Sequence, residues 1–146
     1  MTYEEMWDAF CQKDENAINA DYSAWQFGDN PNELALLVKN GVKKATSSLY
    51  KLYQVDGDAI PFVGDYSIIL DSNDEAVCII KVTKVSLIPF NEITEKQARL
   101  EGEGDLSLQY WRNTHINFFQ SEVKEYGLEF NLDDMIVFEE FEVVYQ

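Results

Sequence analysis

The chain has 146 residues, of which 46% are hydrophobic and 14% are aromatic, and this is enough material for the core of one domain of ordinary size. Acidic residues outnumber basic residues by 27 to 11, which gives a formal net charge of −16. Such a charge repels polyanions and argues against broad, sequence-independent binding to nucleic acid. Any nucleic-acid contact is therefore expected to be local, and a role of the charge in solubility is the simpler interpretation.

The N-terminal segment has neither the basic nor the apolar region of a signal peptide, and no apolar run is long enough to cross a bilayer. We therefore expect a cytoplasmic protein without a membrane partner, with a single domain over residues 1–146. Cys11 and Cys78 lie far apart, and His115 is the only histidine. This pattern predicts neither a disulfide framework nor a zinc site.

Two helices are predicted in the N-terminal part of the chain. Thr2 and Glu5 have the spacing of a capping box and precede apolar residues that recur at helical spacing. Asn30 and Pro31 provide an N-cap and a proline for the first turn of a second helix, which Gly41 ends. Each helix is therefore bounded by local signals.

The segments next to the second helix are harder to assign. Residues 14–29 have no clear period and are predicted to form an ordered loop pinned by aromatic side chains, including Trp25 and Phe27. These rings either cover the core or line a pocket. Residues 46–53 fit either a short helix or a strand.

The second half of the chain predicts a hairpin, two helices and a return to the sheet. Residues 65–70 and 76–88 are apolar and β-branched runs around a polar turn. A short helix over 94–100 leads into an acidic loop, a longer helix begins at Asp105 or Ser107 and runs through Tyr126, and residues 134–145 form one or two strands. The predicted class is α+β, with a curled or closed mixed sheet and helices packed around it.

Two stretches carry the candidate chemistry. Lys43 and Thr46 follow Gly41, so an amine and a hydroxyl lie beside an unobstructed piece of backbone, although a solvated lysine at a helix end is the simpler interpretation of this short pattern. The loop from Glu101 to Asp105 alternates acids with glycines. Its carboxylates either bind a hard divalent cation or cap the following helix.

Three separated motifs, in this order, resemble the ASCH domain family over almost the whole chain. They are Trp25-Gln-Phe27-Gly28-Asp29, then Gly41-Val-Lys43-Lys-Ala-Thr46-Ser-Ser-Leu, then Glu101-Gly-Glu-Gly-Asp-Leu-Ser-Leu-x-x-Trp111-Arg112-x-x-His115-x-x-Phe-Phe. The resemblance, which is to a larger uncharacterised bacterial subgroup, implies a β-barrel of the PUA-like superfold with surrounding helices. It also implies a cleft across the barrel that accepts RNA or a nucleoside.

The resemblance to smaller relatives, the acetylcytidine amidohydrolases, implies catalytic roles for Lys43, Thr46 and Glu101. Thr46 would be the nucleophile, Lys43 the proton acceptor in a desolvated cleft, and Glu101 a group that orients the lysine or passes a proton. Ser48 stands where the family often has an arginine, and this departure concerns substrate anchoring. The candidate ligand-binding residues are Trp25, Phe27, Gly41, Ser48, Glu103, Trp111, Arg112 and His115.

Two classes of function therefore remain open. As an enzyme, the protein would hydrolyse an amide bond of an acylated nucleoside without a required cofactor, or would act as a metal-dependent ribonuclease through a divalent ion at Glu101, Glu103 and Asp105. As a binding module, it would recognise a nucleoside-like ligand or RNA without turnover. Arg112 would hold an oxyanion or phosphate, or form a salt bridge to the acidic loop. A homodimer is compatible with the sequence.

Overall fold

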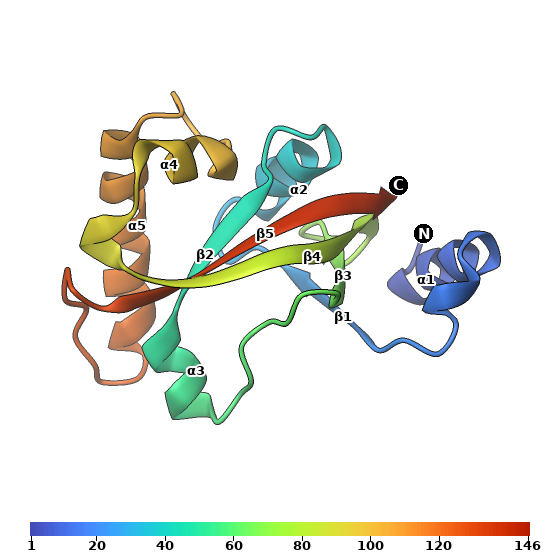
Figure 1. The fold of residues 1–146 in the computed structure, drawn as a ribbon, viewed down its shortest axis with the longest axis horizontal. Coiled ribbons are helices and arrows are strands. Elements are labelled where there is room, and N and C mark those ends of the chain that lie inside the picture. The colour runs from blue at the N-terminus through green and yellow to red at the C-terminus, as the bar shows by residue number, and fades with distance from the viewer.

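The protein is described by a computed structural model that covers residues 1–146, and its centre is one five-stranded sheet in the order β1-β3-β4-β5-β2. The strands are β1 (Tyr22–Gln26), β2 (Ala45–Leu49), β3 (Tyr66–Leu70), β4 (Ala76–Pro89) and β5 (Met135–Tyr145). β1 is parallel to β3, whereas the other neighbouring pairs are antiparallel. The sheet curls into a half-barrel whose two edges are β1 and β2 (Figure 1).

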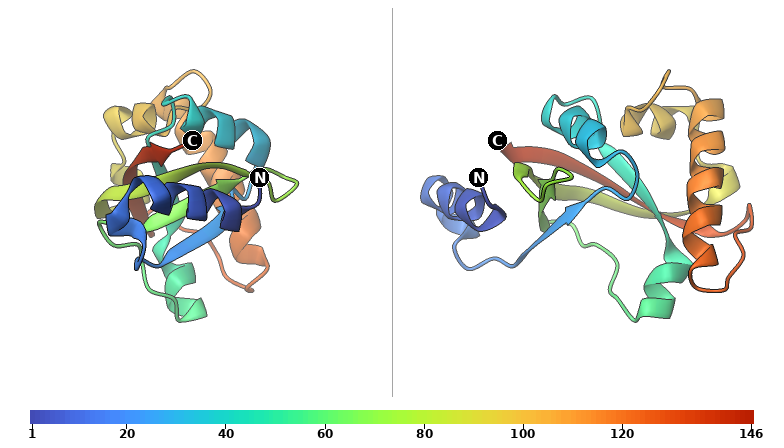
Figure 2. Two further views of the ribbon diagram at one scale, coloured as in Figure 1. Left: turned by 90° about the vertical axis from the view of Figure 1, so that its right-hand side faces the viewer. Right: turned by 180° about the vertical axis from the view of Figure 1, so that it is seen from behind.

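Helices pack around this sheet (Figure 1), which confirms the predicted α+β class. They are α1 (Tyr3–Lys13), α2 (Pro31–Lys39), α3 (Tyr50–Asp56), α4 (Glu95–Glu101) and α5 (Leu108–Lys124), with short 3-10 turns η1 (Glu15–Ala17) and η2 (Phe90–Glu92). Figure 2 shows α1 at one end of the sheet and α5 at the other. No helix combines the length and the apolar character that crossing a membrane requires.

Three groups of buried apolar side chains hold the helices to the sheet. At the α5 end, Trp111 and Phe119 pack against Leu49 of β2 and Phe138 of β5. The other two groups join α1 to β3 and β4, and α2 to β3, β4 and β5. Burying each large apolar side chain contributes about 1.5–3 kcal/mol, so these groups stabilise the packing of the helices on the sheet.

Local cap signals predict several helix ends correctly. The Thr2 hydroxyl accepts a hydrogen bond from the Glu5 N–H at 3.1 Å, and Thr94 and Gln97 form a complete capping box at the start of α4. The Ser107 hydroxyl caps α5 by accepting from the Tyr110 N–H. These caps work because each satisfies a helix N–H that has no partner inside the helix.

The structure corrects the predicted loop over residues 14–29. This segment contains η1 and then β1, which pairs in parallel with β3. β1 is a short edge strand whose partner lies 44 residues further along the chain, as the Ser23 to Ser67 hydrogen bond illustrates. Its strand character therefore comes from a distant neighbour, and no local period reveals it.

Two further assignments are resolved near the second helix. Residues 46–53 contain both a strand and a helix, because β2 ends at Leu49 and α3 begins at Tyr50. Asn30 precedes α2, as predicted, but it has a left-handed backbone and its side chain makes no cap hydrogen bond. The structure confirms Pro31 as the first residue of α2.

Gly102 allows the end of α4 to approach the segment before β2. Its φ is +69°, and a Cβ at this position would lie 2.3 Å from the Val42 carbonyl oxygen. The Lys44 N–H donates to the Leu100 carbonyl at 2.7 Å in the same contact. Only glycine fits a left-handed residue pressed against backbone in this way.

Replacing Gly102 with alanine is expected to destabilise the fold by about 3 kcal/mol or more, because the backbone strain adds to a backbone clash. Gly57 provides a matched control, since it also ends a seven-residue helix with a left-handed φ of +70° but has open space around its missing Cβ. Gly57→Ala should cost only about 1 kcal/mol. Chemical denaturation compares the two variants, and equal losses would contradict the close approach.

Candidate functional site

A pocket of about 710 Å³ lies against β1, β2, β3, β5 and α5. Lys43, Thr46 and Glu101 all line it, so residues far apart in the sequence share one hollow. Glu101 lines it from the end of α4, and α5 contributes Thr114, His115, Phe118 and Glu122. This volume is within the range of about 300–1,000 Å³ that is typical of small-molecule sites.

Lys43 is held at the base of this pocket by the turn that follows α2. Its backbone N–H donates to the Leu37 carbonyl, and the residue as a whole is only 2% exposed. The Lys43 Nζ lies 2.8 Å from Glu103 Oε2, 3.2 Å from Glu101 Oε1 and 3.4 Å from the Glu101 carbonyl oxygen. An ammonium has three N–H groups and no acceptor, so these three oxygens match its protonated form.

Glu101, the last residue of α4, uses both carboxylate oxygens. Oε2 accepts from the Ser47 hydroxyl at 2.5 Å and from the Trp111 indole N–H at 2.6 Å, while Oε1 faces Lys43. His115 Nε2 also lies 3.4 Å from Oε1. Four groups from β2, α5 and the turn after α2 thus converge on one buried carboxylate, which fixes the relative position of these elements.

Opposite charges control the protonation of Glu101 and His115. Burial alone would raise the pKa of Glu101, but the charges of Lys43 and His115 and the hydrogen bonds to this carboxylate hold that pKa well below its usual range. Burial is the largest single influence on His115 and would lower its pKa, but the charge of Glu101, the hydrogen bonds to Glu101 and Trp111 and the charge of Glu103 together raise that pKa. His115 Nδ1 donates to the Trp111 carbonyl at 2.8 Å, so both ring nitrogens face acceptors, as imidazolium requires.

Thr46 and Ser48 lie on β2 and line the pocket. The Ser48 hydroxyl is 2.9 Å from the Tyr53 hydroxyl, whereas the ion pairs of Lys43 and Glu101 do not involve Thr46. Ser48 is therefore already engaged by α3. The half-buried Thr46 hydroxyl remains available to a ligand.

Glu139 is a pocket residue that the sequence reasoning missed. It lies on β5 directly opposite Thr46 in the β2–β5 ladder, and the residue is only 8% exposed. Burial and the negative charge of Asp65, partly opposed by Lys43, raise the pKa of Glu139 to about 7. An acid within the apolar run of the last strand was the available signal, but the sequence alone does not say which face it occupies.

Aromatic side chains form one wall of the pocket. Trp25 and Phe27 line it from the end of β1, and their ring centroids lie 4.9 Å apart in an edge-to-face arrangement. The Lys43 Nζ lies 5.5 Å from the centroid of the Phe27 ring. Both rings also pack with the core group around α2, so they belong to the core as well as to the pocket.

Three of the other candidate residues lie outside this pocket. Trp111 is buried beneath it and contacts the site through Glu101, stacking on His115 with ring centroids 4.2 Å apart. Gly41 lines a separate, smaller hollow beside Lys39 and Lys44. Arg112 is exposed and donates to the Asn91 carbonyl at 3.5 Å, so the salt bridge to the acidic loop is not formed.

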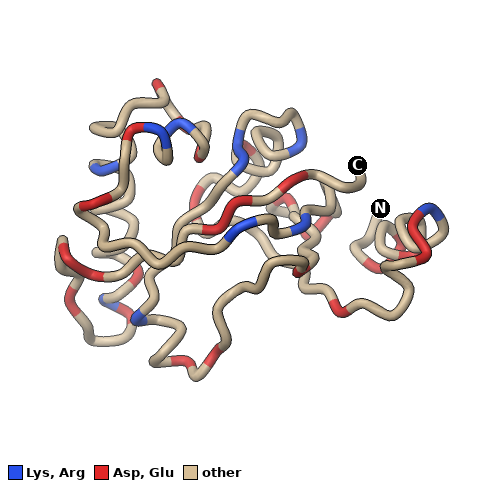
Figure 3. The backbone as a smooth tube through the Cα atoms, viewed as in Figure 1, with Lys and Arg blue, Asp and Glu red and all other residues tan.

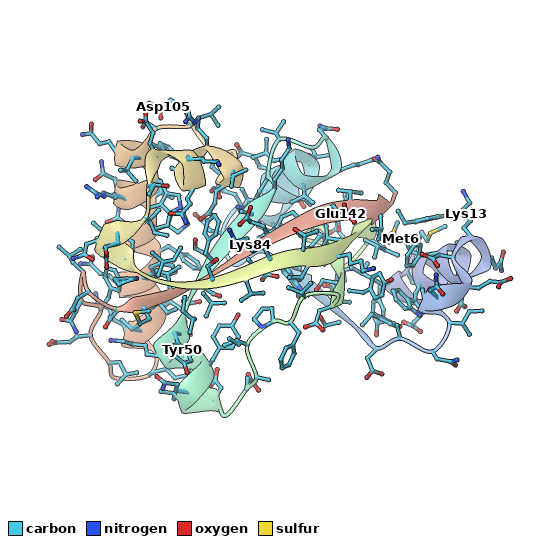
Figure 4. All side chains as sticks on the ribbon, viewed as in Figure 1. Met6, Lys13, Tyr50, Lys84, Asp105 and Glu142 are labelled. Carbon is cyan, nitrogen blue, oxygen red and sulfur yellow. The ribbon has the colours of Figure 1, made fainter.

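The three acids of the loop from Glu101 to Asp105 do not converge on one point, as the metal-binding alternative required. Asp105 lies at the outer tip of the loop between α4 and α5 (Figure 4), and its carboxylate accepts from the Ser107 N–H at 3.0 Å. The three groups with a spacing suited to a metal ion are instead Glu101, Glu103 and His115. Lys43 already takes an oxygen from each of the two glutamates, so a divalent cation would have to displace its ammonium.

Negative charge dominates the pocket lining. Acidic residues are spread along the whole backbone (Figure 3), and the pocket follows this pattern, with Lys43 as its only lysine or arginine. The lining carboxylates are Asp21, Asp29, Asp65, Glu101, Glu103, Glu122 and Glu139. This lining repels anionic ligands and favours uncharged or cationic ones.

Removing the Glu101 charge should lower the pKa of His115. In Glu101→Gln, the main interaction that raises this pKa is lost while burial, which lowers it, remains. The sole histidine of the chain makes the titration of its ring protons by NMR unambiguous. Glu95→Gln, an exposed change at the start of the same helix, should leave the titration unchanged, and an unshifted pKa in Glu101→Gln would contradict the pairing.

Glu139 should make the folded state less stable as the pH rises. A carboxyl whose pKa is near 7 when folded and near 4.5 when unfolded contributes fully below pH 4.5 and loses that contribution as the pH rises through 7. Glu139→Gln lacks this loss, so its free energy of unfolding relative to the parent should increase by about 3 kcal/mol between pH 4 and pH 8. Urea denaturation at several pH values measures this, with Glu142→Gln, an exposed change on the same strand, as the control.

Known proteins share this fold. The family model of the ASCH domain matches residues 23–145. The chain is 34% identical to the crystal structure of an ASCH domain from Lactobacillus crispatus, with a TM-score of 0.93 over 98% of this chain and 94% of that one. It is 35% identical to a protein from Enterococcus faecalis, with a TM-score of 0.86 over 97% of this chain and 87% of that one.

No curated protein matches the chain. The family match nevertheless covers most of the residues, and the first of the two crystal structures extends the likeness to nearly the full chain. The half-barrel and the helices around it are thus the arrangement of this family, as the three sequence motifs implied. The chain belongs to the ASCH domain family.

Proposed function

We propose that the protein binds an acylated nucleoside in the pocket and hydrolyses its amide bond. The observation that supports this most is the placement of an available hydroxyl, Thr46, and a buried ammonium, Lys43, in one hollow of about 710 Å³. Acyl transfer needs a nucleophile and a positive group for the charge that develops on the carbonyl oxygen. Thr46 is held by the β2–β5 ladder, and Lys43 by the backbone hydrogen bond to Leu37 and by its ion pairs.

The lining suits the proposed ligand. Trp25, Phe27 and Phe62 offer aromatic surface to a flat base, and stacking on such rings is worth about 1–3 kcal/mol per base. Seven carboxylates against one lysine disfavour phosphate groups. An uncharged nucleoside therefore fits the pocket better than a nucleotide or a long RNA.

The proposed role of Lys43 is electrostatic. Its three N–H groups face three oxygen acceptors, so the group is arranged to donate hydrogen bonds rather than to accept a proton. The contact to the Glu101 carbonyl, at 3.4 Å, is the longest of the three and the easiest to exchange for a substrate oxygen. Lys43 would then stabilise the oxyanion of the tetrahedral intermediate.

Glu101 serves as a positioning residue in this proposal. Its carboxylate is fully buried and bonded to Ser47, Trp111 and Lys43, and its pKa is held well below the usual range. A group that stays ionised and fully bonded is a poor proton carrier. It would hold the Lys43 ammonium at the pocket, and its bonds to Ser47 and Trp111 join the end of α4 to β2 and α5.

The proposal is tested with N4-acetylcytidine as substrate. Thr46→Ala should lower kcat/KM by about a thousandfold or more, because the attacking oxygen is removed while the binding pocket is retained. Thr83→Ala, an exposed change on β4, should retain full activity. Release of acetate, followed by chromatography, measures the rate.

Other outcomes have distinct meanings. Turnover that survives Thr46→Ala would remove the proposed mechanism. Thermal stabilisation by cytidine or its acetyl derivative without any acetate release would favour a binding module, because a ligand that binds only the folded state stabilises it. Cleavage of RNA that requires added magnesium or manganese would support the ribonuclease alternative instead.

A further inference from the structure

The proposed reaction requires a proton acceptor, and Lys43 does not supply one. Attack by the Thr46 hydroxyl must release its proton, yet the Lys43 N–H groups already face three oxygens. Glu101 is committed to Ser47 and Trp111 on its other oxygen. A further group at the pocket has to take this proton.

We infer that Glu139 is the general base that accepts the Thr46 proton and returns it to the leaving amine. Glu139 and Thr46 are directly opposed residues of neighbouring antiparallel strands, and both line the pocket. Directly opposed side chains project from the same face of a sheet, with Cβ atoms about 4.5–5.5 Å apart. This inference depends on the amide hydrolysis proposed above, and it assigns the proton transfer within it.

The surroundings of Glu139 suit a carboxyl that both accepts and releases a proton. Asp65 raises the affinity of this carboxyl for a proton, while Lys43 lowers it, and Tyr53 is close enough to feel the Glu139 charge. On β4 the opposed residue is Val85, which offers no hydrogen bond from its side chain. Burial together with these charges brings the pKa to about 7, where a carboxyl can both accept and donate a proton at neutral pH.

The reaction then balances without any further co-reactant. The Thr46 oxygen forms a bond to the acyl carbon as its proton passes to the Glu139 carboxylate, and Lys43 stabilises the oxyanion. The intermediate breaks its carbon–nitrogen bond, and the amine leaves with the proton from Glu139. Water then attacks the acyl ester, gives one proton to Glu139, and the released Thr46 oxygen recovers it.

Glu139→Gln tests this assignment because glutamine has nearly the same shape but cannot accept the proton. With N4-acetylcytidine, its kcat/KM should fall by about 10²–10⁴-fold. Its affinity for cytidine, measured by calorimetry, should change by less than about threefold, because base binding does not depend on proton transfer. Glu142→Gln, at an exposed position of β5, should match the parent in both.

The pH profile separates proton transfer from a purely structural role. The parent kcat/KM should rise with pH through about 7 as Glu139 ionises, and Glu139→Asp should keep a rising limb at reduced rate. In Glu139→Gln the residual rate should lose this limb. Loss of affinity for cytidine in step with the rate would indicate a structural role and overturn the inference.

Failure of the inference differs from failure of the proposed function. Acetate release that is abolished in Thr46→Ala but retained with its pH limb in Glu139→Gln would overturn the Glu139 assignment and leave the amide hydrolysis in place. Absence of acetate release by the parent protein would overturn both.

Discussion

The buried pair of Lys43 and Glu101 is the interaction on which the pocket depends. It joins the turn after α2 to the last residue of α4, two points 58 residues apart in the chain. Removing two charges from water costs several kcal/mol for each ion, and the pair is tolerated only because nearly every donor and acceptor is matched. Ser47, Trp111 and Glu103 supply the contacts that complete it.

The pocket contains two kinds of polar group, those that take part in the contacts of this pair and those that do not. Lys43 and Glu101 are paired and buried, and in the proposed reaction they would define where the substrate carbonyl oxygen binds. Thr46 and Glu139 lie on the adjoining strands β2 and β5 and take no part in that network. Chemistry at a hydroxyl needs both conditions, a preorganised charge beside it and a partner whose proton is exchangeable.

Local signals in the sequence predicted where α1, α4 and α5 begin, because a cap depends on residues only a few positions apart. The same reasoning failed for β1, since its strand depends on pairing with β3. Lys43, Thr46 and Glu101 could be singled out from motifs, and the structure brings them to one pocket. Arg112 and Asp105 belong to the same motif but point elsewhere, because helical phase and loop geometry decide which side chains converge.

Glu139 could not be predicted from the sequence for the same physical reason as β1. Its neighbour Glu140 is also acidic, and only the register of β5 against β2 decides which of the two faces Thr46 across the ladder. A shift of one residue would turn Glu139 away from the pocket. The site therefore depends on the ladder that β2 and β5 form, and the Lys43–Glu101 pair is joined to β2 through the Ser47 hydroxyl.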